Sequence, residues 1–250
     1  MSSSSVHSST GKVLTSSDKA LILFSGGQDS TICLGWALEH YNHVETIGFE
    51  YGQRHNVELA CRAAIRKKLT DDFPLWADRL GADHIVNLSF FKELGDSALT
   101  THDKPIKVSN EGLPTTFVPG RNLIFFTTAA ALGWQLGIYH LVGGMCETDT
   151  TGYPDCRQDA LEMLNQTINL GMGQDFVMQM PLVLSSKAKS WQLAHTLGGE
   201  TFVELVREES HTCYRGDRRH AHEWGYGCGD CPACKLRAQG YEEWRRKSHV

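Results

Sequence analysis

A short apolar run that ends in a glycine-rich turn is the feature that most constrains this chain. Ala20–Phe24 has the length and composition of a buried strand, and Ser25–Ser30 (Ser-Gly-Gly-Gln-Asp-Ser) follows it directly. Thr31–Tyr41 is rich in good helix formers, so the pattern predicts a strand, a tight turn and a helix. Backbone N–H groups at a helix N-terminus favour a bound phosphate. These residues alone also fit a simple helix cap by serine or aspartate.

Strands and helices alternate along the rest of the chain, which predicts an α/β fold with a parallel sheet and helices on both faces. Ligands bind such sheets at the carboxyl ends of the strands, where glycine-rich turns fall in this sequence. Further strands are expected at Val44–Phe49, Ile85–Leu88, Ile138–Val142 and Phe176–Met180. Further helices are expected at Asn56–Leu69, Leu75–Leu80 (ended by Gly81), Asn122–Leu136 (ended by Gly137), Ala160–Leu170 and Ser186–Leu197 (ended by Gly198 and Gly199).

Composition narrows the class of partner. Hydrophobic residues make up 41% of the 250 residues and charged residues 21%, which is typical of a globular chain. No apolar run approaches the ~20 residues that a membrane span needs. The net charge of −5 disfavours nucleic acid, because binding there depends on neutralising phosphates. Residues 1–18 are serine-rich and lack the apolar core of a secretory signal. We therefore expect a cytoplasmic protein with small-molecule substrates, and no nucleic-acid or membrane partner.

Four of the eight cysteines crowd the C-terminal fifth of the chain. Two-residue spacings between thiols suit tetrahedral zinc, and four thiolates leave no open position for water, so the zinc would be structural. The pattern also fits free buried cysteines or an iron–sulfur cluster, and His211, His220 and His222 are near enough in sequence to be alternative ligands. The predicted ligands are Cys213, Cys228, Cys231 and Cys234.

With both motifs in place, residues 20–240 resemble the 7-cyano-7-deazaguanine synthase family of queuosine biosynthesis, in the PP-loop ATP pyrophosphatase superfamily. Besides the glycine-rich turn, the matching runs are Tyr51-Gly-Gln-Arg-His55 with Glu58, Thr116-Phe-Val-Pro-Gly-Arg-Asn122, Gly144 to Asp149, Gly152-Tyr-Pro-Asp-Cys-Arg157, Lys187, Thr212-Cys-Tyr214 and Cys228 to Arg237. The serine-rich head lies outside the resemblance. Residues 70–80 look like an added segment, and the stretch between Cys213 and Cys228 looks longer than is usual for the family.

The resemblance implies a Rossmann-like domain of the adenine nucleotide alpha hydrolase type and a ligase that forms a C–N bond. The family converts 7-carboxy-7-deazaguanine and ammonia to the nitrile 7-cyano-7-deazaguanine (preQ0). It activates a carboxylate and then an amide, and each activation cleaves ATP to AMP and diphosphate. The implied cofactors are ATP, Mg²⁺ and structural Zn²⁺, and we expect a homodimer. The expected divisions are a disordered tail over residues 1–18, an ATP-binding domain over 19–205 and a zinc-binding region over 206–250.

The same resemblance assigns candidate site residues. The catalytic candidates are Asp29, Ser30, Arg121 and Lys187. The ATP-binding candidates are Phe24, Ser25, Gly26, Gly27, Gln28, Asp29, Ser30, Thr31, Ile32, Cys33 and Leu34. The substrate-binding candidates are Tyr51, Gln53, Arg54, Arg121, Asn122, Glu147, Asp149, Tyr153, Asp155 and Arg157.

Without the resemblance, these side chains have simpler interpretations. Lys187 fits a surface lysine equally well, Arg121 fits a structural arginine, and acidic residues such as Glu147 are usually solvated in loops. We call the glycine-rich turn Ser25–Ser30 the phosphate loop. Three other functions also fit a chain with this loop and a cluster of thiols. They are a tRNA-modifying PP-loop enzyme, a relative that attaches a deazaguanine to another molecule, and a nucleotide-sensing or scaffold protein with a zinc knuckle. The acidic net charge disfavours the first, and an intact loop with Lys187 disfavours the last.

Overall fold

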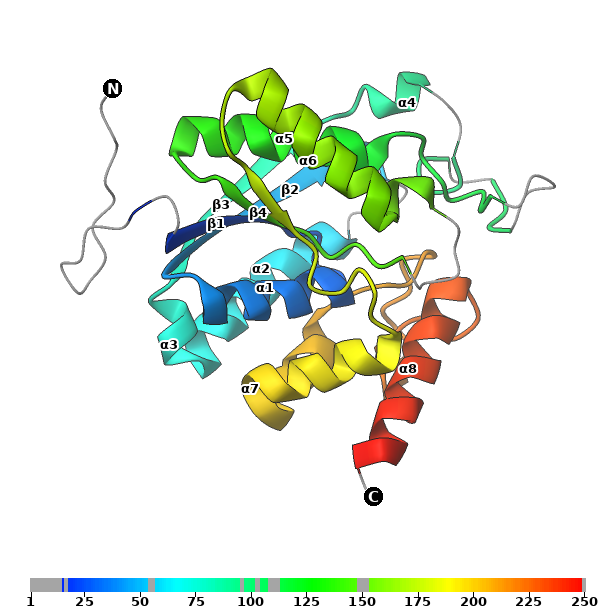
Figure 1. The fold of residues 1–250 in the computed structure, drawn as a ribbon. Coiled ribbons are helices and arrows are strands. Elements are labelled where there is room, and N and C mark those ends of the chain that lie inside the picture. The colour runs from blue at the N-terminus through cyan, green and yellow to red at the C-terminus, as the bar shows by residue number, and fades with distance from the viewer. Residues whose placement is uncertain are drawn as a thin grey trace.

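The protein is built on one parallel sheet, as Figure 1 shows. The computed structural model describes residue 15 and residues 18–53, 57–94, 97–101, 104–107, 113–147 and 153–248. The sheet has five strands in the order β3-β2-β1-β4-β5, and every neighbouring pair is parallel. Its strands are β1 (Lys19–Leu23), β2 (His43–Glu50), β3 (Leu80–Asn87), β4 (His140–Val142) and β5 (Val177–Gln179).

Helices cover both faces of the sheet. In Figure 1, α5 and α6 lie on one face, α1 and α2 lie on the other, and α7 and α8 follow outside α1. The helices are α1 (Gln28–His40), α2 (Val57–Asp72), α3 (Pro74–Ala77), α4 (Phe91–Leu94), α5 (Arg121–Leu136), the 3₁₀ helix η2 (Pro154–Cys156), α6 (Gln158–Met172), α7 (Lys187–Glu209) and α8 (Pro232–Ser248). A two-stranded antiparallel hairpin, β6 (Ala221–His222) and β7 (Gly225–Tyr226), precedes α8.

The central strand β1 divides the core into two apolar clusters. Ala20 and Ile22 pack into the cluster that contains α1, α2, α7 and α8 side chains, whereas Leu21 and Leu23 pack into the cluster on the α5 and α6 face. Successive side chains of a strand point to opposite faces, so a strand covered on both sides is apolar throughout. The continuous apolar run after Lys19 has this cause, and the predicted α/β class is confirmed.

The strand order places a topological switch point between β1 and β4. From β1 the chain builds outward through β2 to β3, and it then returns to add β4 and β5 on the other side of β1. Connections on the two sides of β1 therefore leave in opposite directions and open a crevice at the carboxyl ends of β1 and β4. The Ser25–Ser30 turn and the Gly143-Gly144 turn both lie at this crevice.

One expected helix end is wrong, and another is confirmed within a longer element. The helix expected at Leu75–Leu80 is only α3, and Gly81 lies inside β3 rather than ending a helix. A Cβ at Gly81 would lie 2.5 Å from the His43 ring on β2, so the glycine lets the two strands meet beside a register irregularity. The helix expected at Ser186–Leu197 does end at the predicted glycines, because Gly198 and Gly199 both leave helical geometry. A second helical segment follows this break and continues to Glu209 within α7.

Helix α8 was not predicted, although its pattern was in the sequence. Its buried side chains Cys234, Arg237, Tyr241 and Trp244 recur at helical spacing and face α7. The Trp191 ring on α7 meets the Tyr241 ring edge-on, with centroids 5.1 Å apart. The charged residues between these positions mask the periodicity when only hydrophobic letters are counted.

Gly240 sets the distance between α7 and α8. A Cβ at this position would lie 2.3 Å from the Lys187 Cβ and 2.9 Å from the Lys187 backbone carbon. We predict that Gly240→Ala lowers the free energy of unfolding by about 1–3 kcal/mol, because overpacking forces the first turn of α7 to move. Gly171→Ala on α6 is the matched control, since a Cβ there meets nothing within 4 Å. Thermal melts of both variants that coincide with the parent would contradict this account.

Candidate active site

A cavity of about 300 Å³ lies at the carboxyl ends of the central strands. Residues that follow β1, β2 and β4 form one part of its wall, and the first turns of α1, α2, α5, α7 and α8 form another. The described residues that carry charge into this wall come from α1, α2, α5 and α7, respectively Asp29, Glu58, Arg121 and Lys187. The parallel sheet therefore gathers side chains that are up to 158 residues apart in the sequence.

The glycine-rich turn after β1 is closed by its own hydroxyl groups. Ser30 Oγ accepts a hydrogen bond from the Ser25 N–H at 3.2 Å and donates to the Gly27 carbonyl at 3.1 Å. Ser25 Oγ accepts from the Gly27 N–H at 3.1 Å. These bonds shape the turn without using the amides that follow Gly27.

Two glycines allow other backbone segments to reach this turn. Gly26 has φ +90°, and a Cβ there would lie 2.4 Å from the Glu58 carbonyl oxygen. Gly144, after β4, approaches from the other side, where a Cβ would lie 2.9 Å from the Ser30 backbone nitrogen. Side chains at either position would displace the loop or cover the start of α1.

The N-terminus of α1 is left without a side-chain cap. Its N-cap residue is Gly27, and the Thr31 N–H bonds to the Gly27 carbonyl at 3.0 Å. The amides of the preceding first turn have no helical acceptor, since none lies one turn earlier. With the helix dipole behind them, these amides form a site suited to phosphate.

Lys187 and Asp29 form an ion pair across the cavity. The Lys187 Nζ donates to Asp29 Oδ2 at 2.6 Å, and the two side chains are 9% and 23% exposed. Lys187 is the first residue of α7, and Ser186 caps that helix by accepting from the Lys189 N–H. The Lys187 ammonium group is therefore held in place beside the phosphate loop, whereas the side chain of a surface lysine would be mobile.

Arg121 supplies a second cation in the cavity wall. It begins α5 directly after Gly120, whose φ of +71° turns the chain into the helix. Its guanidinium carbon lies 5.7 Å from the Tyr51 ring centroid. Burial alone lowers the pKa of Arg121, but Tyr51, Tyr153 and Asp155 outweigh burial and raise that pKa above its ordinary value. Its buried Nε has no hydrogen-bond partner among the described residues, so it can bind an anion.

Glu58 has a different environment from Asp29. It lies in the first turn of α2, and burial raises the pKa of its carboxyl to about 7, although the positive charge of Arg121 acts in the opposite direction. We gave this residue no role from the sequence, where it is only part of a matched run. The signal for a role is its half-buried position in the cavity wall, which no sequence pattern carries.

Some of the ATP-binding candidates line the cavity, and the others lie behind its wall. Six of them line the cavity, whereas Ile32, Cys33 and Leu34 are fully buried in the core behind it. Gly26 and Thr31 lie outside the cavity wall, and Thr31 Oγ1 donates to the Gly27 carbonyl at 2.8 Å. The lining candidates are Phe24, Ser25, Gly27, Gln28, Asp29 and Ser30.

The substrate-binding candidates divide in the same way. Those in the cavity wall are Tyr51, Gln53, Arg121, Asn122 and Tyr153. Three others lie outside that wall. Asp155 accepts from the Asn122 N–H at 3.0 Å, Glu147 accepts from the Gln158 N–H at the start of α6 at 3.0 Å, and Arg157 is the N-cap of α6. Arg54 and Asp149 lie outside the described residues.

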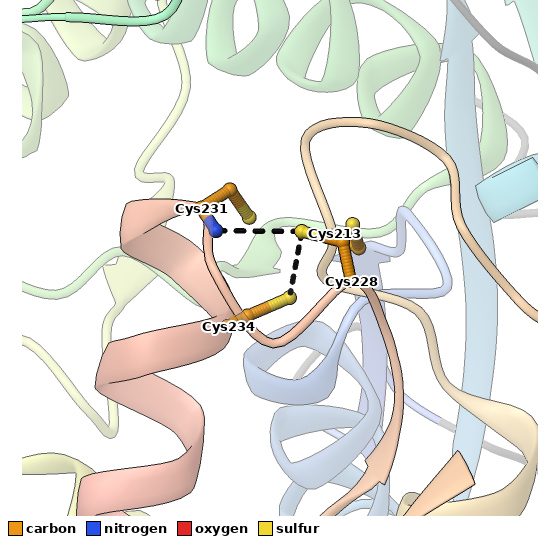
Figure 2. Close-up of side chains that lie close together, drawn as sticks. All are labelled: Cys213, Cys228, Cys231 and Cys234. Carbon is orange, nitrogen blue, oxygen red and sulfur yellow. Dashed lines mark hydrogen bonds between the residues drawn. The ribbon is translucent and has the colours of Figure 1, made fainter. Parts of the chain in front are cut away.

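The four C-terminal cysteines form one cluster, drawn in Figure 2. Their sulfur atoms all lie within 4.8 Å of one another, and Cys228 Sγ is 4.0 Å from Cys234 Sγ. Tetrahedral zinc with Zn–S bonds of about 2.3 Å requires sulfur atoms about 3.8 Å apart. The cluster, Cys213, Cys228, Cys231 and Cys234, therefore could hold a metal ion.

The neighbouring histidines are occupied elsewhere. His220 pairs with Asp217 at 2.7 Å, and His222 Nε2 lies 2.9 Å from the Gly227 carbonyl. His211 is buried, with Nε2 3.1 Å from the Cys213 carbonyl. None of the three is in the cysteine cluster of the described residues.

His211 also connects the cysteine cluster to the phosphate loop. Its backbone N–H donates to the Gly26 carbonyl at 3.0 Å, two residues before the first cysteine of the cluster. The buried Arg237 holds the other side of this segment by donating to Thr212 Oγ1 at 3.0 Å and to the Val206 carbonyl at 2.9 Å. The cluster is therefore a support for the cavity rather than a separate site.

We predict that Lys187→Met lowers turnover of ATP by about 10²–10³-fold, because it removes a fixed charge beside the phosphate loop. Lys189→Met is the matched control, since Lys189 lies on the same helix turn but is exposed. Turnover and nucleotide affinity should be measured for both variants. An equal loss of turnover in Lys187→Met and Lys189→Met would contradict a specific role for Lys187 in the cavity.

Comparisons with known proteins agree on one family. The model of the queuosine biosynthesis protein QueC family matches residues 19–245. The 7-cyano-7-deazaguanine synthase of Caulobacter sp. (strain K31) is 56% identical over 227 residues, which is 91% of this chain and 90% of that protein. Its counterpart in Granulibacter bethesdensis is 54% identical over 243 residues, 95% of this chain and 96% of that protein.

A solved structure adds a distant likeness in fold. A 4-thiouridine synthetase in complex with RNA and bound ATP superposes with a TM-score of 0.52 and 15% sequence identity, over 94% of this chain and 55% of that one. Among the described residues, no helix has the length and apolarity to cross a membrane. The family match over nearly the whole described fold, with relatives identical at more than half of the aligned positions, shows that this chain belongs to the queuosine biosynthesis protein QueC family.

Proposed function

We propose that this chain converts 7-carboxy-7-deazaguanine and ammonia into 7-cyano-7-deazaguanine, consuming two ATP. The observation that carries the proposal is the coincidence of two facts. The family match extends over residues 19–245, and the same residues assemble an uncapped helix N-terminus and two fixed cations around one cavity. Adenylation of an acid needs such an arrangement, because negative charge develops on the phosphates as diphosphate leaves.

The first activation makes the carboxylate reactive. A carboxylate is a poor electrophile, so its oxygen attacks the α-phosphorus of ATP and displaces diphosphate. The α1 amides and Lys187 are suited to hold the phosphates, and Arg121 is suited to orient the carboxylate. Ammonia then attacks the acyl carbon and AMP departs, which leaves the amide. Holding both reactants in one cavity replaces a bimolecular encounter with an intramolecular step.

The second activation uses the same cavity. The amide oxygen attacks the α-phosphorus of a second ATP, and loss of AMP from the adenylated amide gives the nitrile. Both adenylation steps develop negative charge at the same phosphate positions. The same hydrogen-bond donors, the α1 amides and Lys187, are therefore suited to both steps. The aromatic wall supports a planar bicyclic substrate, because the Phe49 and Phe125 rings stack at 4.2 Å and the Tyr51 ring lies 5.4 Å from the Phe125 ring.

The implied metals have different roles. Four thiolates fit Zn²⁺ and leave no position for substrate, so zinc would stabilise the segment that holds the phosphate loop through His211. Mg²⁺ would accompany the phosphates of ATP and neutralise charge there, with Asp29 as the nearest carboxylate of the described loop.

The proposal extends to the setting of the enzyme. The net charge of −5 supports small-molecule substrates rather than nucleic acid, because nucleic-acid binding depends on neutralising phosphates. We propose that the enzyme works in the cytoplasm. We also propose a homodimer, and the division into an ATP-binding domain over residues 19–205 and a zinc-binding region over 206–250 that packs on it.

Product stoichiometry tests the reaction. We expect about two AMP and two diphosphate for each nitrile formed, because each activation is an attack at the α-phosphorus. The 7-amide supplied directly should give the nitrile with one AMP and no added ammonia. Nucleotide chromatography against nitrile yield measures both ratios. ADP as the main nucleotide would exclude adenylation, and a deazaguanine conjugate in place of the nitrile would favour a different acceptor.

Metal content tests the cysteine cluster. We predict one zinc per chain by elemental analysis, and its loss in Cys231→Ser with a lower melting temperature, because binding of structural zinc contributes folding free energy. Cys61→Ser is the control, since Cys61 is buried outside the cluster. Nucleotide affinity should fall with the zinc, because His211 links the cluster to Gly26. Full zinc content in Cys231→Ser, or an iron–sulfur absorption band in the parent, would refute the assignment.

A further inference from the structure

Two carboxylates line the described part of the cavity, and they are held differently. Asp29 is paired with Lys187 at 2.6 Å. Glu58 has no ion pair within 4 Å among the described residues, although it lies beside the phosphate loop. Its own carbonyl oxygen is packed where a Cβ of Gly26 would be, so the first turn of α2 is fixed against that loop.

The groups around Glu58 favour a carboxyl that exchanges protons. Burial is the largest influence and disfavours its charged form, and Arg121 on α5 opposes burial, so the pKa of Glu58 is about 7. Tyr51 beyond β2 and Cys61 on α2 also face it, and burial raises the pKa of both, which keeps them neutral near pH 7. The remaining charges of the wall, Asp29 and Lys187, compensate each other.

The proposed reaction needs a proton acceptor that its phosphate-binding groups do not provide. Ammonium, like a lysine side chain, is protonated at neutral pH and must lose a proton before its nitrogen can attack. The adenylated amide carries two N–H protons, and both must leave before a nitrile can form. Arg121 and Lys187 are cations and cannot accept these protons. A base whose pKa lies near the working pH is the most effective acceptor.

We propose that Glu58 is the general base that removes protons from nitrogen in both halves of the reaction. This inference rests on the proposed function. In the first half, the Glu58 carboxylate takes one proton from ammonium and releases it to solvent. The ammonia nitrogen then forms the C–N bond, a second N–H proton passes to Glu58, and AMP leaves with the electron pair of the broken C–O bond. In the second half, Glu58 takes one N–H proton of the adenylated amide and releases it to solvent. It then takes the second proton as the C–O bond to AMP breaks and the C≡N bond forms.

Glu58→Gln tests the proposal, because it keeps the shape of the side chain and removes the proton acceptor. Exchange of labelled diphosphate into ATP, dependent on 7-carboxy-7-deazaguanine and measured without ammonia, reports the first adenylation alone. We expect this exchange to stay within about threefold of the parent. Conversion of the 7-amide to the nitrile should fall by about 10²–10⁴-fold, the usual contribution of a general base. Glu50→Gln is the matched control, since Glu50 ends β2 near the cavity but is exposed and outside its wall.

The pH profile separates a base from a structural residue. The 7-amide step contains no ammonia, so its pH dependence is not that of the nucleophile. Only the ionised carboxylate accepts a proton, so the parent rate should rise with pH through about 7, and Glu58→Gln should lose this rise. A flat parent profile from pH 6 to 8.5, an unchanged amide step in Glu58→Gln, or a parallel loss of exchange would each overturn the inference. Absence of exchange in the parent would instead refute the proposed function.

Discussion

The backbone of Gly26 is the contact on which the rest of the site depends. The Glu58 carbonyl from α2 occupies the space that a side chain would fill, and the His211 N–H donates to the Gly26 carbonyl at 3.0 Å. The phosphate loop is thus held between an early helix and the segment that leads into the cysteine cluster. Neither neighbour can shift without moving the loop, because close-packed interiors transmit small displacements.

The position of the Lys187 cation also depends on close packing between segments that are distant in sequence. Lys187 reaches Asp29 only because α7 begins at the edge of the cavity, and Gly240 lets α8 approach that first turn closely. Arg237, also on α8, is buried and donates to backbone carbonyls of α7 and of the loop after the hairpin strand β6. Burial lowers the pKa of its guanidinium to about 10, so it remains charged at neutral pH and its hydrogen bonds stay strong. The C-terminal region is therefore part of the framework of the site.

The parts of the fold and the site that depend on neighbouring residues in the sequence could be predicted. The β1 run, the serine and glycine turn and the thiol spacings each have a local cause, and the fold class followed from the alternation of strands and helices. The wrong helix end had a tertiary cause, since Gly81 serves a contact with His43 on another strand. The break at Gly198-Gly199 has a local cause in the two glycines and was predictable. Helix α8 was missed because its buried positions include Arg237, which a hydrophobic pattern counts as polar.

The proposed role of Glu58 could not be predicted from the sequence, because it depends on what the fold places around the side chain. Asp29 and Glu58 carry the same functional group, and they differ only in what the fold places around them. Lys187, 158 residues away in the sequence, pairs with one carboxylate, whereas the other is half-buried in the cavity wall without an ion pair among the described residues. Two titratable groups whose surroundings differ in this way can take different parts in one reaction. A cavity that must both bind phosphate and remove protons from nitrogen gains from this separation, because a cation held on a carboxylate competes with a proton for the same oxygen atoms.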